Sequence, residues 1–595
     1  MSSYDPNRIT YIGETDYRSK RVKFGIKAKD RTRHVYVIGK TGVGKSVLLE
    51  NMAVQDIQNG EGFAFIDPHG RSADLLLDYI PKERVDDVLY FAPFDLANPV
   101  SFNVMEDIGP DKRHLVAAGL MSAFKKIWVD AWSARMEYIL NNTILALLEY
   151  PGSTLLGINR MLADKDFRKE VVSHVTDPGV KSFWEDEFAN YTDRFAQEAT
   201  PAIQNKVGQF TANPVIRNII GQPKSTFNIR EIMDKKKILI INLSKGQVGE
   251  DSANLLGSMI ITKIYLAAMS RADLREPELE KLPNFYLYVD EFQSFANESF
   301  ADILSEARKY KLNLTIAHQY IEQMSEEVRA AVFGNVGTMM TFRVGATDAE
   351  YLEKEYAPAF TAEDLVNLDR YQIYLKLMID GMASSPFSAR TLPPITVPHI
   401  SYRDVSIARS RAQFAHPRAV VENDILKWHQ KNFGKSAQPR PEGEGHGNHG
   451  PRREERRPQQ PRTERPEHAH RGPAPAPAPA VDRETQLRAA VSLSNLRHDA
   501  DRHKQKHKHV KKEKGPSQAH LSDLRAALSA VIGDVQANAA EKTPTPPPAA
   551  PQKPKEEPRR ETEKTEPPQQ KQEKQQPKEV PEHVLKDLFK RDEKN

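Results

Sequence analysis

The stretch HVYVIGKTGVGKS, residues 34–46, decides the fold of this chain. An apolar run, His34–Ile38, predicts a buried strand, and the apolar spacing that follows Lys45 predicts a helix as far as about Asn59. The residues between them fit the pattern G-x-x-x-x-G-K-[ST] in full; they are Gly39, Lys40, Thr41, Gly42, Val43, Gly44, Lys45 and Ser46. Glycines let the main-chain N–H groups wrap a phosphate, and a helix N-terminus adds a favourable dipole. The stretch therefore predicts a nucleotide-binding loop in which Lys45 reaches the β- and γ-phosphates and Ser46 binds Mg²⁺.

A second apolar strand ends in two acids. The sequence FYLYVDE predicts a buried strand over Phe285–Val289, followed directly by Asp290 and Glu291. We expect Asp290 to hold Mg²⁺ through water and Glu291 to face the γ-phosphate, where it can polarise the attacking water. Simple switch GTPases have no such pair, and the chain has no NKxD-type base selector. The sequence therefore favours ATP over GTP.

Three further side chains belong to the same geometry. Gln319 follows a predicted strand, Leu312–Ala317, and an amide there can bond the γ-phosphate or its water. Arg308 precedes that strand and Arg343 follows the predicted strand Thr338–Phe342. Both arginines are candidate fingers, which stabilise charge on a phosphate during transfer and often come from a neighbouring subunit. The alternative for each arginine is a surface salt bridge.

The sequence Asp67-Pro68-His69-Gly70 follows another short predicted strand, Phe63–Ile66. This end of a parallel sheet is the side on which ligands bind. Asp67 either supports the Mg²⁺ site or caps the following turn, and the sequence does not distinguish the two. His69 has no second histidine at metal-binding spacing, so we do not predict a metal there.

Strands and helices alternate along most of the first 434 residues, which predicts an α/β fold with a mostly parallel sheet covered on both faces. From about Asp111 to Ile220 the periodicity is helical, without clear strands. We therefore expect one nucleotide-binding domain interrupted by an all-helical insertion. The other strands predicted in this domain are Val88–Phe91, Ile238–Leu243 and Ile373–Leu377.

Composition changes near Gly434. The 595 residues contain 85 basic and 81 acidic residues; 33 and 25 of these lie in 435–595, which leaves 52 and 56 in the first 434 residues. The same tail holds 22 of the 41 prolines, and it is predicted to be disordered because its composition cannot form a packed core. Three tail segments have helical spacing and form either transient helices or motifs that fold on a partner; they are Arg483–Arg497, Leu521–Ala537 and Glu582–Lys590.

The chain contains no cysteine, which excludes disulfides, Cys-ligated zinc, iron–sulfur clusters and a thiol nucleophile. Its first residues lack the apolar core of a signal peptide, and no run of 18 apolar residues occurs. The nearest such stretch, Asn254–Met269, is interrupted by Lys263 and predicts a buried helix. We therefore expect a soluble cytoplasmic protein without a transmembrane segment.

The motifs in their order resemble the HerA–FtsK superfamily of motor ATPases. The segments that carry the resemblance are RHVYVIGKTGVGKS (33–46), IDPHG (66–70), YLYVDEF (286–292) and ARKYKLNLTIAHQ (307–319). Within the superfamily the chain is most similar to TraD/TraG/TrwB-type coupling proteins of type IV secretion and to HerA-like helicases, over about residues 9–400. The resemblance implies a RecA-like core, a hexameric ring and ATP-driven movement of DNA through a central channel.

The resemblance also implies roles for single residues. Lys45 and Ser46 match the phosphate and magnesium ligands, and Asp290 and Glu291 match the hydrolysis acids. Gln319 matches the sensor glutamine. Arg308 matches the arginine finger of the coupling proteins, and Arg343 matches a position that HerA-like enzymes favour; we rank Arg308 first.

The domain assignment combines the strand and helix pattern, the change in composition and the RecA-like core that the resemblance implies. It consists of an N-terminal segment (1–30), a RecA-like ATPase core in two parts (31–105 and 226–400), an all-helical insertion (106–225), a C-terminal helical extension (401–434) and the disordered tail (435–595). The transmembrane helices of membrane-bound coupling proteins are not present in this sequence, and the first predicted strand, His34–Ile38, leaves no room for a HerA-type N-terminal β-barrel. Membrane attachment would then go through a partner, most naturally one that binds the tail.

Two other functions share these motifs. One is a secretion or pilus-assembly ATPase that acts on protein, and the other is an ATP-gated scaffold. The acidic balance of the first 434 residues argues mildly against a broadly basic DNA-binding surface, although a local basic stripe is enough for phosphate contacts.

Overall fold

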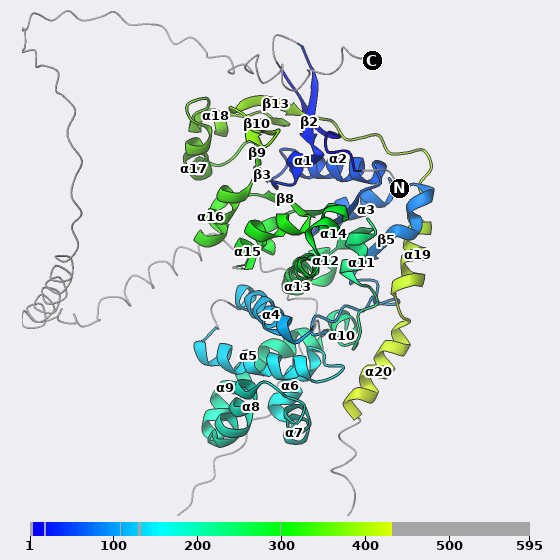
Figure 1. Ribbon diagram of the computed structural model, residues 1–595, viewed down its shortest axis with the longest axis vertical. Helices are drawn as coiled ribbons and strands as arrows, with labels where there is room; N and C mark the ends of the chain where they lie inside the picture. The colour runs from blue at the N-terminus through cyan, green and yellow to red at the C-terminus, as the bar shows by residue number, and fades with distance from the viewer. Residues whose placement is uncertain (1–3, 17–19, 107–108, 129–131, 298, 431–595) are drawn as a thin grey trace, which may run out of the picture. The chain divides into compact units, whose positions relative to one another are not determined.

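A large, mostly parallel sheet forms the centre of the fold (Figure 1). The computed structural model describes residues 4–16, 20–106, 109–128, 132–297 and 299–430. Within these residues the largest sheet has 11 strands, in the order β2 (Lys23–Lys27), β1 (Ile9–Glu14), β13 (Phe387–Thr391), β10 (Gln372–Lys376), β9 (Thr338–Thr341), β3 (Val35–Ile38), β8 (Leu312–His318), β7 (Phe285–Val289), β4 (Gly62–Asp67), β6 (Ile238–Asn242) and β5 (Val88–Phe91). The strands from β9 to β5 are parallel, and β10, β13, β1 and β2 continue the sheet in antiparallel pairing. The predicted α/β class with a mostly parallel sheet is confirmed.

Helices cover both faces of this sheet. Successive side chains of β3 alternate, so that Val35 and Val37 join one apolar core and Tyr36 and Ile38 join the other. The first core is covered by α2 (Lys45–Gln58) and α3 (Arg71–Leu77), and the second by α13 (Glu250–Met269), α15 (Ser299–Glu306) and α16 (Glu326–Asn335). The other helices among these strands are α1 (Ala28–Arg31), α11 (Ile229–Asp234), α12 (Lys245–Val248), α14 (Glu276–Lys281), α17 (Ala346–Tyr356) and α18 (Ala362–Val366). Burial on both faces explains why the parallel strands are nearly continuous apolar runs.

A run of helices separates β5 from β6 along the chain (Figure 1). These helices are α4 (Arg113–Ile127), α5 (Ala134–Glu149), α6 (Leu156–Ala163), α7 (Lys165–Val172), α8 (Pro178–Ser182), α9 (Asp193–Ala212) and α10 (Pro214–Ile220). Helix α4 packs closely on α13. The absence of a side chain at Gly119 allows this contact, since a Cβ atom there would lie only 2.4 Å from Cγ2 of Thr262. The run of helices agrees with the predicted insertion, whose limits, 106–225, stay a prediction.

Helix α13 is the most apolar long helix. In the described part of the chain, Glu250–Asp273 is the one helical stretch long and apolar enough to cross a membrane, with a mean hydropathy of 1.3. Within the fold, however, 67% of that window is buried, against α4 and α11 among others. The prediction of a buried helix over Asn254–Met269 is therefore confirmed.

After β13 the chain crosses the face formed by α2 and α3 and then follows the edge strand β5. Asn51 on α2 accepts a hydrogen bond from the main-chain N–H of Ile395, at 3.0 Å, and Ser410 accepts one from the main-chain N–H of Tyr90 on β5, at 2.9 Å. Two helices end the described chain; they are α19 (Arg403–Phe414), which packs on β5, and α20 (Arg418–Gln430), which packs on α10. The extension thus links the sheet to the helical insertion.

The predicted disordered tail, 435–595, lies outside the described residues. So do its three helix-capable segments, Arg483–Arg497, Leu521–Ala537 and Glu582–Lys590. Disorder in the tail and the limits of the predicted domains stay predictions.

The first strand begins earlier than the sequence predicts, so the prediction that His34–Ile38 comes first is wrong. Strands β1 and β2 precede it, and β1 pairs with β13, more than 370 residues away in the chain, through Gly13 and Thr391. Glycines interrupt both early strands, and a Cβ atom on Gly25 would lie 2.1 Å from the carbonyl oxygen of Thr10. Two strands with glycine in them give a weak alternation signal, and β13, which joins this pair to the sheet, lies too far along the chain to be inferred from local pattern.

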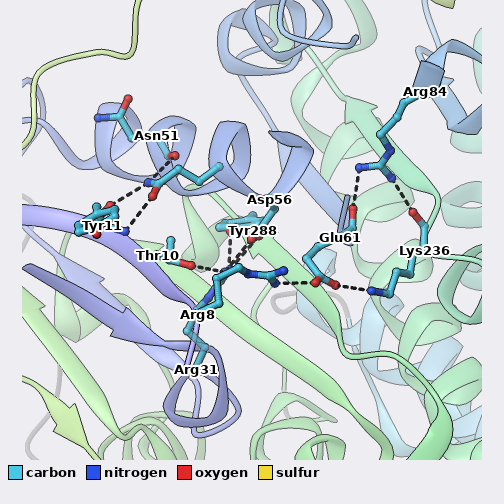
Figure 2. Close-up of polar contacts among 11 residues, drawn as sticks. Arg8, Thr10, Tyr11, Arg31, Asn51, Asp56, Glu61, Arg84, Lys236 and Tyr288 are labelled. Atoms are coloured by element: carbon cyan, nitrogen blue, oxygen red, sulfur yellow. Dashed lines mark hydrogen bonds and ion pairs between the residues drawn. The ribbon is translucent and has the colours of Figure 1, made fainter. Parts of the chain in front are cut away.

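A buried polar cluster joins β1, α2 and β7 (Figure 2). Arg31 donates two hydrogen bonds to the carboxylate of Asp56 on α2, at 2.7 and 2.9 Å, and another to Thr10 on β1, at 2.9 Å. The hydroxyl of Tyr288 on β7 donates to the same carboxylate and accepts from Arg31 at 2.6 Å. The guanidinium carbon also lies 3.8 Å from the ring centroid of Tyr286. Arg31 and Asp56 are almost fully buried, so each charge depends on the other.

Replacing Arg31 with methionine should strongly destabilise the protein. Asp56 would keep its buried charge without a cation, which costs about 3–5 kcal/mol of unfolding free energy. Urea unfolding of the full chain measures this as a lower midpoint.

A matched control is Arg8→Met, because Arg8 pairs with Glu61 while its side chain stays 21% exposed. Lys236 also lies 3.2 Å from Glu61, so the acid keeps a cation in that variant. We expect a loss of about 1 kcal/mol or less. Equal midpoints for the two variants would show that burial of the Arg31–Asp56 pair contributes nothing special.

Candidate functional site

The loop between β3 and α2 has the backbone shape of a phosphate cradle. Gly42 and Gly44 have φ angles of 77° and 123°, and no atom lies within 4 Å of a Cβ placed on Gly42. Gly39 packs so tightly on Phe342 that a Cβ atom there would lie 2.6 Å from Cβ of Phe342. The predicted glycines are therefore required where they stand, two for a left-handed backbone and one for close packing.

Lys45 begins α2 and its ammonium lies over the loop. Its Nζ donates to the carbonyl oxygens of Gly39, at 2.7 Å, and Lys40, at 3.2 Å. Burial lowers the pKa of Lys45, against the opposing effect of the nearby Glu291 and Asp290 carboxylates. The amine is thus held at the loop by weak neutral acceptors, which a phosphate anion outcompetes.

The second strand motif meets this loop directly. The Oγ of Ser46 donates to Oδ2 of Asp290, at 2.8 Å, so the two predicted magnesium ligands are in contact. Asp290 follows β7, and its other oxygen accepts the main-chain N–H of Glu291, at 2.9 Å. Asp290 is 2% exposed, and burial raises its pKa to about 6, with a smaller opposing effect from Ser46.

Strand β8 lies between β3 and β7, and this order brings Gln319 to the centre of the site. Gln319 accepts a hydrogen bond from the hydroxyl of Thr41 in the loop, at 3.0 Å, and its amide donates to Oε1 of Glu291. The amide of Gln293 donates to Oε2 of the same carboxylate. The structure therefore joins the loop, the glutamine and the acid in one chain of hydrogen bonds.

Glu291 also has an unusual backbone. Its φ of 49° and ψ of 51° place it in the left-handed region, which costs a side-chain-bearing residue about 1–2 kcal/mol. Such strain is retained mainly at sites where the side-chain direction matters. Glu291 is 8% exposed, which suits a group that must act on one water molecule rather than on bulk solvent.

Asp67 turns out to cap the turn after β4. One carboxylate oxygen accepts the main-chain N–H of His69, at 2.8 Å, and the other accepts that of Ala73, at 3.0 Å. Of the two interpretations that the sequence left open, the structure supports the cap.

The two candidate arginine fingers lie at opposite ends of the parallel strands: Arg308 precedes β8, and Arg343 follows β9. The carbonyl oxygen of Arg343 accepts the main-chain N–H of Lys40, at 2.9 Å, so Arg343 is next to the loop of its own chain. Arg308 is exposed and precedes β8, whose seven residues separate it from Gln319 by about 20 Å. The structure brings Arg343 to the loop and does not bring Arg308 there within one chain.

Sequence reasoning missed two residues of this site. Gln293 binds Glu291, and its position two residues after the acid offered the only local signal. Tyr371 packs on Gly44 and its main-chain N–H donates to the carbonyl oxygen of Val43, at 3.0 Å. Its neighbourhood comes from the pairing of β10 with β9, which no local pattern indicates.

The residues present fit a nucleoside triphosphate with Mg²⁺. The open space at Gly42 and the ammonium of Lys45 suit phosphate oxygens, and the oxygens of Ser46 and Asp290 suit a hard divalent cation. Mg²⁺ commonly takes its remaining ligands from water and phosphate. The roles of the single residues stay predictions.

The buried carboxyl of Asp290 predicts a stabilising substitution. Because its pKa is raised to about 6, the folded protein holds this proton more tightly than the unfolded chain does, so stability falls as pH rises from about 4 to 6. Without Mg²⁺ and nucleotide, Asp290→Asn should therefore melt at a higher temperature than wild type at pH 7.5, by up to about 3 kcal/mol in free energy.

Mg²⁺ with ADP should reverse that order, since the cation favours the carboxylate. The control is Asp67→Asn, which weakens two main-chain hydrogen bonds and should lower the melting temperature with or without Mg²⁺. If Asp290→Asn melted at a lower temperature than wild type in the absence of Mg²⁺, the raised pKa of Asp290 would be contradicted.

Comparison with known proteins places these observations in a family. A family model described as "Type IV secretion-system coupling protein DNA-binding domain" matches residues 22–355, more than half of the chain. No curated protein sequence matches at a significant level. The family assignment therefore rests on the family model.

Solved structures with a similar fold include the plasmid coupling protein TrwB in complex with ADP and Mg²⁺. That structure is 17% identical, covers 63% of this chain and 89% of its own, and has a TM-score of 0.48. The unbound monoclinic form of the bacterial conjugative coupling protein TrwBdeltaN70 is 15% identical over 65% of this chain and 90% of its own, with a TM-score of 0.46. VirB4 of Thermoanaerobacter pseudethanolicus is 14% identical over 67% of this chain and 99% of its own, with a TM-score of 0.42.

Proposed function

This chain belongs to the family of type IV secretion-system coupling protein DNA-binding domains, and on that premise we propose that it is an ATP-hydrolysing motor that binds and moves DNA. The observation that carries the proposal is the chain of hydrogen bonds from Thr41 through Gln319 to Glu291, beside the contact of Ser46 with Asp290. A protein that only binds nucleotide does not need an acid and a glutamine held together at the γ-phosphate position. Their pairing supports hydrolysis.

The residues divide the work of hydrolysis. Loop N–H groups and Lys45 bind and orient the phosphates, and Ser46 and Asp290 hold Mg²⁺, which neutralises charge on the β- and γ-phosphates. Glu291 accepts the proton of the attacking water, and Gln319 orients that water or the γ-phosphate. Thr41 connects Gln319 to the loop, so that loss of the γ-phosphate changes the contacts of the glutamine.

We extend the proposal to the assembly. A hexameric ring places a finger from one subunit at the nucleotide of the next, and DNA passes through the channel. The acidic balance of the first 434 residues confines the DNA contacts to a local basic lining. The motor works in the cytoplasm and reaches the membrane through partners that bind its tail.

Replacing Glu291 with glutamine should abolish turnover while ATP still binds. Removing the general base lowers kcat by about 100-fold or more, whereas the phosphate contacts of the loop remain. ATPase assays with and without single- and double-stranded DNA, together with nucleotide titrations, measure both effects. Wild type should be stimulated by DNA.

Glu231→Gln provides the matched control, because Glu231 forms an exposed ion pair with Lys235 at the end of α11, away from the loop and from Arg308 along the chain. It should hydrolyse ATP like wild type. Normal function of Glu291→Gln would favour an ATP-gated scaffold. ATPase activity that ignores DNA, with recovery of secretion proteins on the helical insertion, would favour a secretion or pilus-assembly ATPase.

Mixing two inactive variants should identify the finger. Arg308→Ala keeps an intact loop, and Lys45→Ala keeps an intact Arg308, so a mixed ring contains interfaces where a working loop meets a working finger. Arg308 lies at the amino-terminal end of β8, whereas the phosphate loop of the same chain lies at the carboxyl ends of the strands. We therefore expect the mixture to regain ATPase activity.

Arg343→Ala is the contrasting variant, since Arg343 adjoins the loop of its own chain. If Arg343 acts within its subunit, mixing Arg343→Ala with Lys45→Ala restores nothing. Restoration of activity with Arg343→Ala and none with Arg308→Ala would overturn our ranking of Arg308 as the finger.

Electron microscopy of the full chain with ATP and DNA should show six-fold rings.

A further inference from the structure

Two strained residues flank the phosphate loop from opposite sides. In the described part of the chain, six residues other than glycine have positive φ angles, and two of them, Glu291 and Tyr371, adjoin this loop. Glu291 stands on the side of β8 and β7. Tyr371, with φ of 69°, directly precedes β10, on the side of β9 and β10. An outlier of this kind motivates the search for a function.

The strain at Tyr371 is maintained by contacts on both sides of its backbone. Its N–H donates to the carbonyl oxygen of Val43, at 3.0 Å, and its carbonyl oxygen accepts the N–H of Thr391 on β13, at 2.9 Å. The ring lies against the last glycine of the loop, since a Cβ atom on Gly44 would lie 2.8 Å from Cδ1 of the ring. Tyr371 is therefore fixed at the loop and only partly buried.

Arg370 completes this surface. Its guanidinium carbon lies 4.8 Å from the ring centroid of Tyr371, and its side chain is exposed. Among the residues that the structure describes, no carboxylate forms an ion pair with it. The stacking holds a planar cation beside the loop while its polar groups remain open to a ligand.

The roles proposed for the acids give a nucleotide in the loop a direction. In that proposal Ser46 and Asp290 hold Mg²⁺ and Glu291 faces the γ-phosphate, which puts both on the side of β7 and β8. The nucleoside at the other end of the triphosphate then extends to the opposite side of β3, where β9 and β10 lie. Arg370 and Tyr371 are the exposed and half-buried residues that meet it there.

We propose that Arg370, backed by the ring of Tyr371, forms the nucleoside subsite of this nucleotide site; the inference rests on the proposed function. The guanidinium stacks on the base and donates to ribose or base oxygens. Stacking on a planar cation accepts any base face, so the subsite contributes affinity for the nucleoside more than choice between bases. Tyr371 acts by positioning Arg370 and by filling the space beside Gly44.

The test compares ADP with inorganic tripolyphosphate, a phosphate chain that carries no nucleoside; each variant is compared with wild type for the same ligand. Titration calorimetry on the full chain with Mg²⁺ gives both affinities. Arg370→Gln and Arg370→Lys should each bind ADP about tenfold more weakly, because lysine keeps the charge and loses the plane. Their affinity for tripolyphosphate should stay within about twofold of wild type.

Tyr371→Leu should show the same selective loss, because leucine keeps bulk beside Gly44 but offers no ring to Arg370. Matched controls are Arg329→Gln and Tyr351→Leu, which remove another arginine–tyrosine stack, with 5.4 Å between guanidinium carbon and ring centroid, on α16 and α17. Both should bind ADP like wild type.

Equal weakening of ADP and tripolyphosphate in every variant would overturn the inference, since it would mean that the pair only braces the loop. Unchanged ADP affinity would overturn it as well. The proposed function fails separately, if wild type binds neither ligand or if Lys45→Ala weakens neither.

Discussion

The buried ion pair of Arg31 and Asp56 holds together the elements that carry the two halves of the nucleotide site. Helix α2 begins at the phosphate loop and carries Asp56 near its end, and β7 carries Tyr288 and ends at Asp290 and Glu291. One oxygen of Asp56 accepts hydrogen bonds from both Arg31 and Tyr288. Either charge left alone in this interior would be strongly destabilising, so the pair holds α2 in a fixed position against β7. In that position Ser46 contacts Asp290.

The sequence predicts those parts of the fold and of the site that local patterns at the ends of strands indicate. Lys45, Ser46, Asp290, Glu291 and Gln319 each follow a buried apolar strand, and parallel strands present their carboxyl ends at one edge of a sheet. Once the strands are known to be parallel, it follows that these residues lie at the same edge of the sheet; the strand order decides which of them are neighbours. The order adds one detail, because β8 lies between β3 and β7 and so places the amide within reach of both the loop and the acid.

The parts that the sequence does not predict depend on pairing between distant segments. Tyr371 reaches the loop only because β10 turns back antiparallel to β9, and the paired strands β1 and β2 join the sheet only through β13. Glycine residues such as Gly13 and Gly25 also weaken the alternation of β1 and β2. The left-handed backbone of Glu291 is equally invisible in sequence, since glutamate gives no signal for positive φ.

The acid and the helical insertion are mechanically connected through close packing. The turn after Glu291 places Phe295 on α13, where a Cβ atom on Gly257 would lie 2.2 Å from its ring. Farther along the same helix, Thr262 fills the space above Gly119 on α4. Interiors packed to this density leave no free volume between the side chains. A shift of the turn toward α13 therefore moves α13, and α4 with it. Gln319 binds both Glu291 and the phosphate loop, so in the proposed mechanism a change at the γ-phosphate would act on that turn through hydrogen bonds and on α4 through packing.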